Sequence, residues 1–458
     1  MDLNVIILAA GQGKRMRTAL PKVLHRLAGR PMLEHVVDAA RSLEPARILV
    51  VYGHRGEQLR QALPHLEVQW VEQSDRLGTG HAVQQAMPLV DGNAMVLVLY
   101  ADVPMIETAT LSRLIDQARD GALAVVTARL ADPSGYGRIV RDSAGHIMRV
   151  VEERDADDAV RAIDEINTGI LAARADNLAR WLSRLDNRNA QAEFYLTGVI
   201  AMAAAEGRVL SITPVSNEGI LGVNDRMQLA ALERSWQRRA AERLMNNGVT
   251  LLDPARFDLR GELNAGVDVV IDVNVVLEGR IALADGVYVG PNVVLRDVTV
   301  GEATRIEANC VIERADIGAR CRVGPFARIR PETVIDEEVH LGNFVEIKKS
   351  TIGRGSKINH LSYVGDAKVG SEVNIGAGTI TCNYDGVGKY VTVIGDRAFI
   401  GSDTQLVAPV TVGAGAYIGA GSTITRDAPP EELTLSRAPQ ETRKGWKRKN
   451  RAVKTGEQ

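Results

Sequence analysis

The sequence predicts an α/β chain with two unlike folds: a Rossmann-like parallel sheet wrapped by helices, joined by a long helix to a parallel β-helix of hexapeptide repeats. Three observations predict this fold class. An aliphatic residue returns every six positions between Val267 and Ile424. Before residue 226, short aliphatic runs alternate with helical patterns. Between these two regions lies one amphipathic pattern without Gly or Pro.

The six-residue period identifies the β-helix. About one residue in four in this region is Ile, Val or Leu, so six aliphatics in register have a chance probability of about 2 in 10,000. One such series is Ile394, Ile400, Leu406, Val412, Ile418 and Ile424. In a parallel β-helix each coil takes three hexads, and the aliphatics stack into an internal column. A polar, glycine-rich stretch from Thr381 to Lys389 interrupts the period, and such excursions commonly carry function.

Composition places the chain among ordinary globular proteins. It has 458 residues, 45% of them hydrophobic and 24% charged, with a formal net charge of −2. The low net charge argues against nucleic-acid binding, and no apolar run has membrane-spanning length, so we expect a cytoplasmic protein without stable membrane association. The cysteines at 310, 321 and 382 fit neither a disulfide framework nor a metal site, and are interpreted as packing residues.

A glycine loop follows the first aliphatic run. The run Val5 to Ala9 suits a buried strand, and it leads into Gly11, Gly13, Arg15 and Met16. The loop is neither a dinucleotide fingerprint nor a Walker loop. Two cations, Arg15 and Lys22, beside backbone amides at the end of a first strand predict a cradle for a triphosphate. The alternative interpretation is a solvated basic loop.

A carboxylate follows another predicted strand. Asp102 comes directly after the run Val96 to Tyr100, and ligands of such sheets bind at the carboxyl ends of the strands. Asp102 is therefore a candidate metal ligand. The alternative is a carboxylate that caps the next helix.

Taken in order, the motifs of the first half resemble those of sugar-1-phosphate nucleotidyltransferases. The motifs are Leu8-Ala9-Ala10-Gly11-Gln12-Gly13, Pro21-Lys22, Gln73, Leu77-Gly78-Thr79-Gly80, Tyr100-Ala101-Asp102, Gly135-Tyr136-Gly137-Arg138, Val151-Glu152, Glu165-Ile166-Asn167-Thr168-Gly169 and Gly222-Val223-Asn224.

The resemblance implies a role for each matching residue. It assigns the phosphates to Arg15 and Lys22 as catalytic residues, and a magnesium ion to Asp102 with Asn224. The uracil and sugar contacts that it implies involve Leu8, Ala9, Gly11, Gln73, Gly78, Thr79, Tyr100, Gly137, Glu152, Asn167 and Asn224. In the reaction so implied, the sugar phosphate attacks the α-phosphorus of UTP in line, and pyrophosphate leaves. Lys14 departs from the family, which usually has threonine there, and we expect this to alter affinity rather than abolish chemistry.

The join between the two folds is predicted to be one helix. Apolar residues recur at helical spacing from Leu229 to Leu244, with arginines between them on what is most simply a solvated face. We therefore expect a nucleotidyltransferase domain over residues 1–226, a linker helix over 227–248 and a β-helix acetyltransferase domain over 249–458.

Polar residues gather in hexads of the second half. Arg330 and Lys348 could form an anion site, while His360 suits proton abstraction near neutral pH because its unperturbed pKa is about 6.5. A single histidine on a repeat surface is more often structural. The cluster with Tyr363 and Asn374 favours the functional interpretation.

The second half also resembles a known family. The segments 325–331, 342–346, 374–379 and 382–386 are similar to the acetyltransferase half of the bacterial bifunctional N-acetylglucosamine-1-phosphate uridyltransferase/glucosamine-1-phosphate acetyltransferases. The resemblance makes His360 the catalytic base, and it implies a left-handed β-helix and a homotrimer. The sugar-phosphate contacts that it implies are Arg330, Lys348, Tyr363, Asn374, Asn383, Tyr384 and Lys389. The acetyl-CoA contacts that it implies are Ala377, Ser402, Ala420 and Arg437.

Three functions remain open at this point. The first is a bifunctional enzyme that acetylates glucosamine 1-phosphate and then uridylylates the product, N-acetylglucosamine 1-phosphate, to UDP-N-acetylglucosamine. The second is a monofunctional nucleotidyltransferase whose β-helix only regulates or oligomerises. The third is a catalytically silent regulatory subunit, which the presence of Arg15, Lys22 and Asp102 disfavours. The basic tail, with Lys444, Lys447, Arg448, Lys449 and Arg451, is interpreted as a solvated end.

Overall fold

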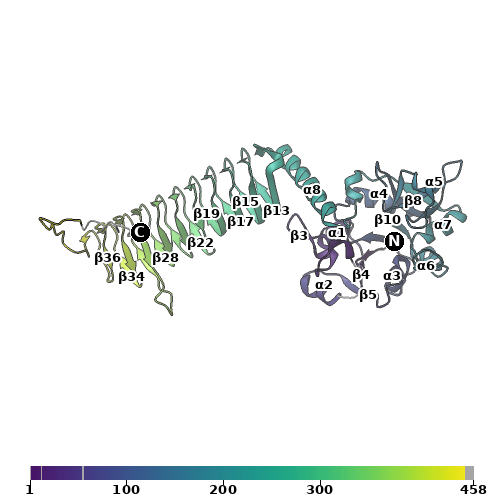
Figure 1. Ribbon diagram of the computed structural model, residues 1–458, viewed down its shortest axis with the longest axis horizontal. Coiled ribbons are helices and arrows are strands. Elements are labelled where there is room, and N and C mark those ends of the chain that lie inside the picture. The colour runs from purple at the N-terminus through teal and green to yellow at the C-terminus, as the bar shows by residue number, and fades with distance from the viewer. Residues whose placement is uncertain (1, 12, 54–55, 449–458) are drawn as a thin grey trace, which may run out of the picture. The chain divides into compact units, whose positions relative to one another are not determined.

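The computed structural model describes residues 2–11, 13–53 and 56–448. These residues fold as two compact units (Figure 1). The first unit comprises the residues up to Leu244 together with Phe257–Gly261, and the second comprises Met245–Arg256 and the residues from Glu262 onward. The two fold types predicted from the sequence are confirmed: a Rossmann-like α/β unit and a parallel β-helix.

The first unit is built on a twisted sheet of order β11-β7-β10-β6-β1-β4-β5, and a hairpin of β8 and β9 pairs with β10. The strands are β1 (Leu3–Leu8), β4 (Arg47–Tyr52), β5 (Gln69–Glu72), β6 (Met95–Tyr100), β7 (Leu123–Arg129), β8 (Gly137–Arg141), β9 (Ile147–Val151), β10 (Glu165–Arg174) and β11 (Val209–Ile212). A short ribbon pairs β2 (Arg26–Leu27) with β3 (Arg30–Pro31).

One strand of this sheet departs from the parallel arrangement that the sequence predicts. β10 runs antiparallel to both β6 and β7, whereas β1, β4, β5 and β6 pair in parallel. The reason is the connection, because parallel neighbours need a crossover of a dozen residues or more over one face. Between β7 and β10 the chain instead forms the β8–β9 hairpin, and it re-enters the sheet at the end where β7 leaves it, since Glu165 pairs with Arg129.

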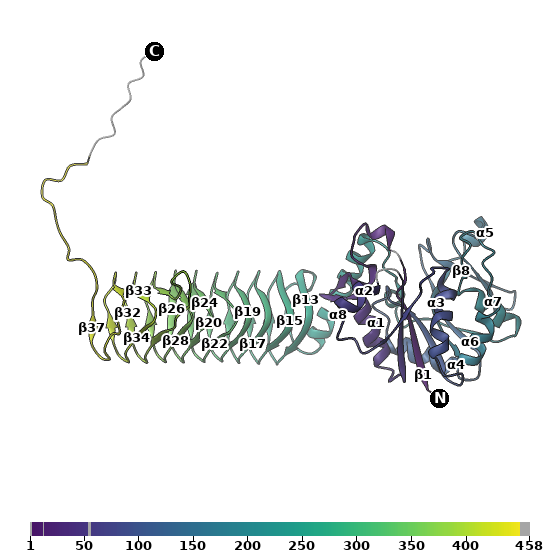
Figure 2. The ribbon, with the colours of Figure 1, turned by 90° about the horizontal axis from the view of Figure 1, so that it is seen from below.

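Helices cover both faces of this sheet (Figure 2). One core contains residues of α1 (Met32–Arg41), α2 (Gly56–Ala62) and α4 (Thr108–Ala118), and the other contains residues of α3 (Thr79–Ala86), α6 (Ala175–Leu182) and α7 (Gly198–Ala205). Side chains of β1 alternate between the two cores, with Val5 and Ile7 in one and Ile6 and Leu8 in the other. A strand buried on both faces explains the unbroken aliphatic run in the sequence.

The helix expected at the join is α8 (Arg226–Asn246), and it packs within the first unit. Its Leu232 belongs to a cluster with Met16 and Met32, and it is 4% exposed. Gln237 donates to the carbonyl of Leu259 at 2.9 Å and accepts from the Leu259 amide at 2.8 Å, so it holds the segment Phe257–Gly261 against the helix.

The second unit stacks parallel strands in coils of three faces. The first face contains β12 (Thr250–Leu251), β14 (Val270–Ile271), β16 (Tyr288–Val289), β18 (Arg305–Ile306), β20 (Arg322–Val323), β23 (His340–Asn343), β26 (Lys357–His360), β29 (Asn374–Ile375), β32 (Phe399–Ile400), β35 (Tyr417–Ile418) and β37 (Leu433–Thr434). The second contains β21 (Arg328–Ile329), β24 (Glu346–Lys348), β27 (Tyr363–Gly365), β30 (Ile380–Cys382), β33 (Gln405–Val407) and β36 (Thr423–Ile424). The third contains β22 (Thr333–Ile335), β25 (Thr351–Ile352), β28 (Ala367–Val369), β31 (Thr392–Ile394) and β34 (Val410–Val412). In the earlier coils, β13 (Phe257–Ala265), β15 (Val275–Leu283), β17 (Val294–Val300) and β19 (Val311–Ile317) are long strands, and β15, β17 and β19 pair side by side.

The coils keep a strict register. Arg305, Arg322, His340 and Lys357 pair successively on the first face, so these coils advance by 17 or 18 residues. The coil that contains the excursion is longer, because Asn374 pairs with Phe399. The hexad aliphatics point inward and are buried; Ile400 and Ile418, for example, are both fully buried. Some coils have 17 residues instead of 18 because one of their three repeats is five residues long instead of six. The shorter repeat leaves the aliphatic side chains pointing inward.

The carboxyl end of the described chain follows β37 without further helices or strands up to residue 448. Its side chains are exposed, including Trp446, which is 74% exposed. Lys444, Lys447 and Arg448 lie in this segment, whereas Lys449 and Arg451 of the predicted basic tail lie outside the described residues. Across the described ranges, none of the helices combines the length and apolar character needed to cross a membrane.

Candidate functional site

A cavity of about 860 Å³ opens at the carboxyl ends of β1, β5 and β6 in the first unit. Many of the residues singled out from the sequence line it. They are Leu8, Ala9, Gly11, Arg15, Lys22, Gln73, Gly78, Thr79, Tyr100, Asp102, Glu152 and Asn224. Its position follows from the topology, since parallel strands end at one edge and leave their loops facing a common space.

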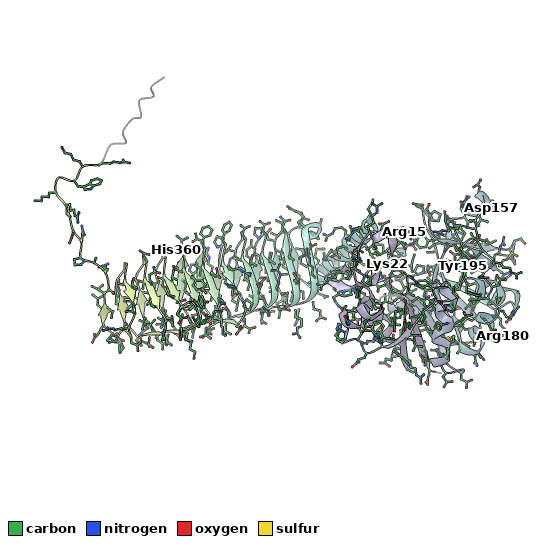
Figure 3. All side chains as sticks on the ribbon, turned by 60° about the horizontal axis from the view of Figure 1, so that its bottom comes forward. Arg15, Lys22, Asp157, Arg180, Tyr195 and His360 are labelled. Carbon is green, nitrogen blue, oxygen red and sulfur yellow. The ribbon has the colours of Figure 1, made fainter. Side chains whose placement is uncertain are left out.

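The glycine loop forms the floor of this cavity. Ala9 donates its amide to the carbonyl of Val51 at 2.8 Å, which fixes the loop to the neighbouring strand. Gly13 has a φ of +58°, and a Cβ on it would lie 2.8 Å from the Cβ of Lys22. Only glycine fits this position, because the backbone is left-handed and the stem of Lys22 passes directly over it. The glycine loop and the side chain of Lys22 therefore pack directly against each other. Figure 3 labels Arg15 and Lys22.

The two predicted metal ligands converge on one point. The ammonium of Lys22 contacts Oδ2 of Asp102 closely and Oδ1 of Asn224 at 3.0 Å. Asp102 also holds the Asn224 segment through its carbonyl, which accepts from the Val223 amide at 2.9 Å. The described residues contain no cluster of three or more His, Cys, Asp or Glu side chains able to bind a metal by themselves. One carboxylate and one amide oxygen directed at a cation fit magnesium, which takes its remaining ligands from phosphates and water.

The opposite wall is a second tight loop. Gln73 is 2% exposed and donates to the carbonyl of Gly78 at 3.0 Å. Gly78 has a φ of +112°, and a Cβ there would lie 2.6 Å from the carbonyl oxygen of Phe194. Thr79 accepts from the amide of Leu196 at 3.0 Å. These contacts fix Gln73, Gly78 and Thr79 in the lining of the cavity.

A third wall carries a buried carboxylate. Glu152 accepts from the hydroxyl of Thr197 at 3.0 Å, and burial raises the pKa of this carboxyl group while that hydrogen bond opposes the shift. Gly137 lies against Glu152, since a Cβ on it would be 3.4 Å from Oε2. Asn167 pairs with Gly137 across β10 and β8, and its buried Oδ1 has no hydrogen-bond partner among the described residues. Tyr100 is partly buried beside them, and desolvation raises the pKa of its hydroxyl.

Several lining residues were missed by the sequence reasoning. They are Val23, Arg76, Ala82, Glu153, Arg154, Gln191 and Glu193. Thr197 was missed as well. Most of these side chains lie in loops without a repeated spacing, so no pattern in the sequence sets them apart from other surface positions.

In the second unit, the predicted base and acetyl-CoA residues share one edge of the β-helix. This edge ladder contains Asn343, His360, Ala377, Ser402 and Ala420, one from each successive coil. Backbone hydrogen bonds connect these positions from coil to coil. The carbonyls of Asn343, His360, Ala377 and Ser402 accept from the amides of Leu361, Gly378, Asp403 and Gly421, at 3.2, 3.3, 2.7 and 2.8 Å respectively. Arg437 donates to the carbonyl of Ala420 at 2.6 Å and so joins the same edge.

His360 has a defined tautomer on this edge. Its Nδ1 lies 3.0 Å from Oδ1 of Asn343 on the preceding coil. Because an amide oxygen only accepts, Nδ1 is the donor in this contact, and in the neutral imidazole the lone pair is on Nε2. The imidazole is exposed, and the sequence reasoning missed Asn343 as its partner. Asn374 and Tyr363 lie on the two faces that flank the edge, in β29 and β27.

A second edge gathers cations at the other end of β27. Arg330 donates to Glu346 at 2.9 Å. The ammonium of Lys389 lies beside Lys348 and, with some burial, lowers the pKa of Lys348. Asn383 is 7% exposed and donates its side-chain amide to Asp366, a residue that the sequence reasoning did not single out.

The predicted residues of the second unit therefore occupy two edges rather than one continuous cleft. Tyr384 and Lys389 belong to the excursion from the hexad pattern, and they form an isolated antiparallel bridge. The hydroxyl of Tyr384 donates to the carbonyl of Gly386 at 2.6 Å, which closes the excursion on itself.

The fold and the two polar clusters define a nucleotidyltransferase-type unit fused to a hexapeptide-repeat transferase. Residues 5–182 match the MobA-like NTP transferase domain, and residues 392–426 match the six repeats of the bacterial transferase hexapeptide. The chain is 58% identical to bifunctional protein GlmU of Methylococcus capsulatus over 456 residues, with 99% of both chains covered. It is also 58% identical to bifunctional protein GlmU of an Azoarcus species, with 97% of this chain and 99% of that one covered. The chain belongs to the GlmU family.

Proposed function

We propose that the chain makes UDP-N-acetylglucosamine in two steps, one in each unit. The second unit transfers the acetyl group of acetyl-CoA to the amine of glucosamine 1-phosphate. The first unit transfers a uridylyl group from UTP to the resulting N-acetylglucosamine 1-phosphate and releases pyrophosphate. The observation that carries the proposal is the convergence of Arg15, Lys22, Asp102 and Asn224 in one cavity of a chain that aligns with GlmU proteins over both units.

In the first unit, the protein positions two anions and neutralises their charge. Gln73 and the Gly78–Thr79 backbone face the uracil, while Leu8, Ala9 and Gly11 support the nucleotide from the loop. Arg15 and the loop amides hold the triphosphate. Glu152 and Asn167 orient the sugar so that its phosphate oxygen faces the α-phosphorus. No protein nucleophile is required, because in-line attack by a positioned phosphate suffices.

Asp102 and Asn224 would hold the magnesium ion. When bound, the metal neutralises phosphate charge between the two substrates. The ammonium of Lys22 contacts both oxygens, which supports this point as one where a cation is favoured.

In the second unit, His360 is the general base. Nε2 accepts a proton from the sugar's amine as the nitrogen attacks the thioester carbonyl. The carbon–sulfur bond then breaks, and the leaving sulfur takes up this proton so that CoA departs as the thiol. Asn343 keeps Nδ1 protonated, so Nε2 stays available. Arg330, Lys348 and Lys389 bind the sugar phosphate, with Tyr363, Asn374, Asn383 and Tyr384 around the sugar. Ala377, Ser402, Ala420 and Arg437 line the path of acetyl-CoA.

We further propose that the chain acts as a homotrimer in the cytoplasm. The acetyl-transfer residues lie on two edges of one β-helix, and an adjacent copy would close the space between them. This arrangement is supported by the exposure of His360, Ser402 and Ala420 on the edge ladder, where a neighbouring copy could contact them.

The test is to measure both half-reactions on one preparation. Thiol release from acetyl-CoA should depend on glucosamine 1-phosphate, and pyrophosphate release from UTP should depend on N-acetylglucosamine 1-phosphate and magnesium. Pyrophosphate release without any thiol release would overturn the bifunctional proposal and leave a monofunctional nucleotidyltransferase with a regulatory β-helix.

A further inference from the structure

A buried carboxylate lies where a phosphate site calls for positive charge. Asp366 is 8% exposed and neighbours the cationic edge of Arg330, Lys348 and Lys389. A carboxylate facing the substrate would repel its phosphate. The burial of Asp366 and its bond to the Asn383 amide show that it faces the protein instead.

The contacts of Asp366 join three segments. Its amide donates to the carbonyl of Lys348 at 3.0 Å, on the preceding coil. Its carboxylate accepts from Asn383, where the excursion leaves the β-helix, and its carbonyl accepts from the amide of Thr392 at 3.2 Å, where the excursion returns. The amide of Tyr390 also donates to the carbonyl of Asn383 at 2.9 Å. Asp366 therefore fastens both ends of the loop 383–391 to the coil that carries Lys348.

The backbone conformation at Asp366 favours an aspartate at this position. Its φ is +48°, in the left-handed region where Asn and Asp are the non-glycine residues most readily accommodated. Electrostatics adds a second role. Lys389 lowers the pKa of Lys348, and Asp366 acts on it in the opposite direction. Two ammonium groups side by side repel each other, and one nearby carboxylate offsets part of that repulsion.

We propose that Asp366 is a positioning residue of the sugar-phosphate site: its carboxylate holds the Asn383 loop, and with it Lys389, beside Lys348. Its negative charge also lies beside the paired ammonium groups and offsets part of their mutual repulsion. This inference rests on the proposed acetyl transfer to glucosamine 1-phosphate and names a residue that this reaction needs without touching the substrate.

Two variants separate the two roles. D366N keeps an oxygen that accepts from Asn383 but removes the charge, whereas D366A removes both. E332Q is the matched control, because Glu332 is another carboxylate at a left-handed corner (φ +64°), pairs with Lys349 at 3.6 Å and lies outside the cluster. KM for glucosamine 1-phosphate and kcat are measured by thiol release at pH 7 and pH 9, with uridylyl transfer followed on the same full-length samples.

The expected results differ between the variants. D366A should raise KM for glucosamine 1-phosphate by about tenfold or more at both pH values, since the buried Asn383 amide loses its partner and the loop shifts. D366N should raise KM mainly at pH 9, because without the carboxylate Lys348 loses its proton at lower pH. In both variants kcat should change by less than KM, and uridylyl transfer should be as in the wild type. E332Q should behave as the wild type in every measurement.

The outcomes that overturn the inference are distinct from failure of the proposed function. If D366N leaves both KM and its pH dependence unchanged, the charge of Asp366 has no part in phosphate binding. If either variant lowers kcat and leaves KM unchanged, Asp366 acts on the chemistry itself rather than by positioning. If the wild-type chain releases no thiol from acetyl-CoA in the presence of glucosamine 1-phosphate, the proposed acetyl transfer fails, whatever the variants do.

Discussion

A single lysine links the glycine loop to the two residues proposed to bind the metal. Lys22 passes over Gly13 of the glycine loop and ends between Asp102 and Asn224. Its ammonium group pairs with the partly buried carboxylate of Asp102, which would be costly to leave without a cation.

The variant D102A tests this arrangement. Removing the carboxylate should lower uridylyl transfer by about two orders of magnitude or more, because charge on the α-phosphate is no longer neutralised as the attacking oxygen approaches. Acetyl transfer should stay within about twofold of the wild type, since it takes place in the other unit. Coupled assays on one sample compare the two rates, and a parallel loss of both would indicate unfolding rather than loss of the metal site.

The variant H360A tests the base in the second unit. Positioned general bases contribute about 100- to 10,000-fold, so acetyl transfer should fall within that range, mainly in kcat. N343A should cause a smaller loss, because His360 remains but its tautomer is no longer fixed. Near-normal acetyl transfer by H360A between pH 6 and pH 9 would show that His360 is structural and that another group accepts the proton.

At the scale of elements, α8 is part of the fold of the first unit. Leu232 and Leu244 are buried on it, and Leu232 packs in the cluster with Met16, the residue directly after Arg15. Burial of each leucine contributes about 1.5–3 kcal/mol, a sizeable share of the roughly 5–15 kcal/mol that stabilises a typical domain. The helix therefore supports the glycine loop as well as continuing the chain.

A pair of fragments tests this role of α8. A fragment of residues 1–261 should keep uridylyl transfer, because it retains the helix and the segment that Gln237 holds. A fragment of residues 1–226 should lose most of this activity and unfold at a lower temperature, which thermal melting monitored by circular dichroism would measure. Equal stability and activity of the two fragments would show that the cluster around Leu232 is dispensable.

At the scale of the whole molecule, the two activities should be separable while assembly affects only one. If the acetyl-transfer site is closed by a neighbouring copy, dilution into the monomeric range should abolish thiol release and leave uridylyl transfer per chain unchanged. Sedimentation velocity on the same dilution series would give the oligomeric state. A monomer with full acetyltransferase activity would contradict a shared site.

The fold was largely predictable because its strongest signals are periodic. The hexad series requires only that inward positions be aliphatic, and the buried strands β1, β4, β6 and β7 appear as continuous apolar runs. The direction of β10 was not predictable in this way. Its sense depends on the path of the preceding hairpin, which leaves no period in the sequence.

The candidate sites were predictable to the extent that motifs carry them. Glycines at close approaches, such as Gly13 and Gly78, leave a visible mark because no other residue fits. Residues that act through a partner on another coil have no such signature in the sequence. Asn343 and Asp366 become meaningful only when His360 and Asn383 stack beside them, which requires the register of the coils.

The coil register also sets the rule by which this chain can change its length. The coils between Arg305 and Lys357 repeat after 17 or 18 residues, and a side chain keeps its neighbours only if the number of residues between coils is preserved. Removing one whole coil, such as residues 288–304, would join Val287 to Arg305 and leave the edge ladder from Asn343 onward intact. Removing a single hexad would instead remove one third of a coil. The faces after the deletion would then stack on different faces of the coils before it. Natural or engineered variants of the second unit should therefore differ in length by whole coils, or by insertions between strands at the corners of a coil. The excursion 383–391 is an insertion of this kind.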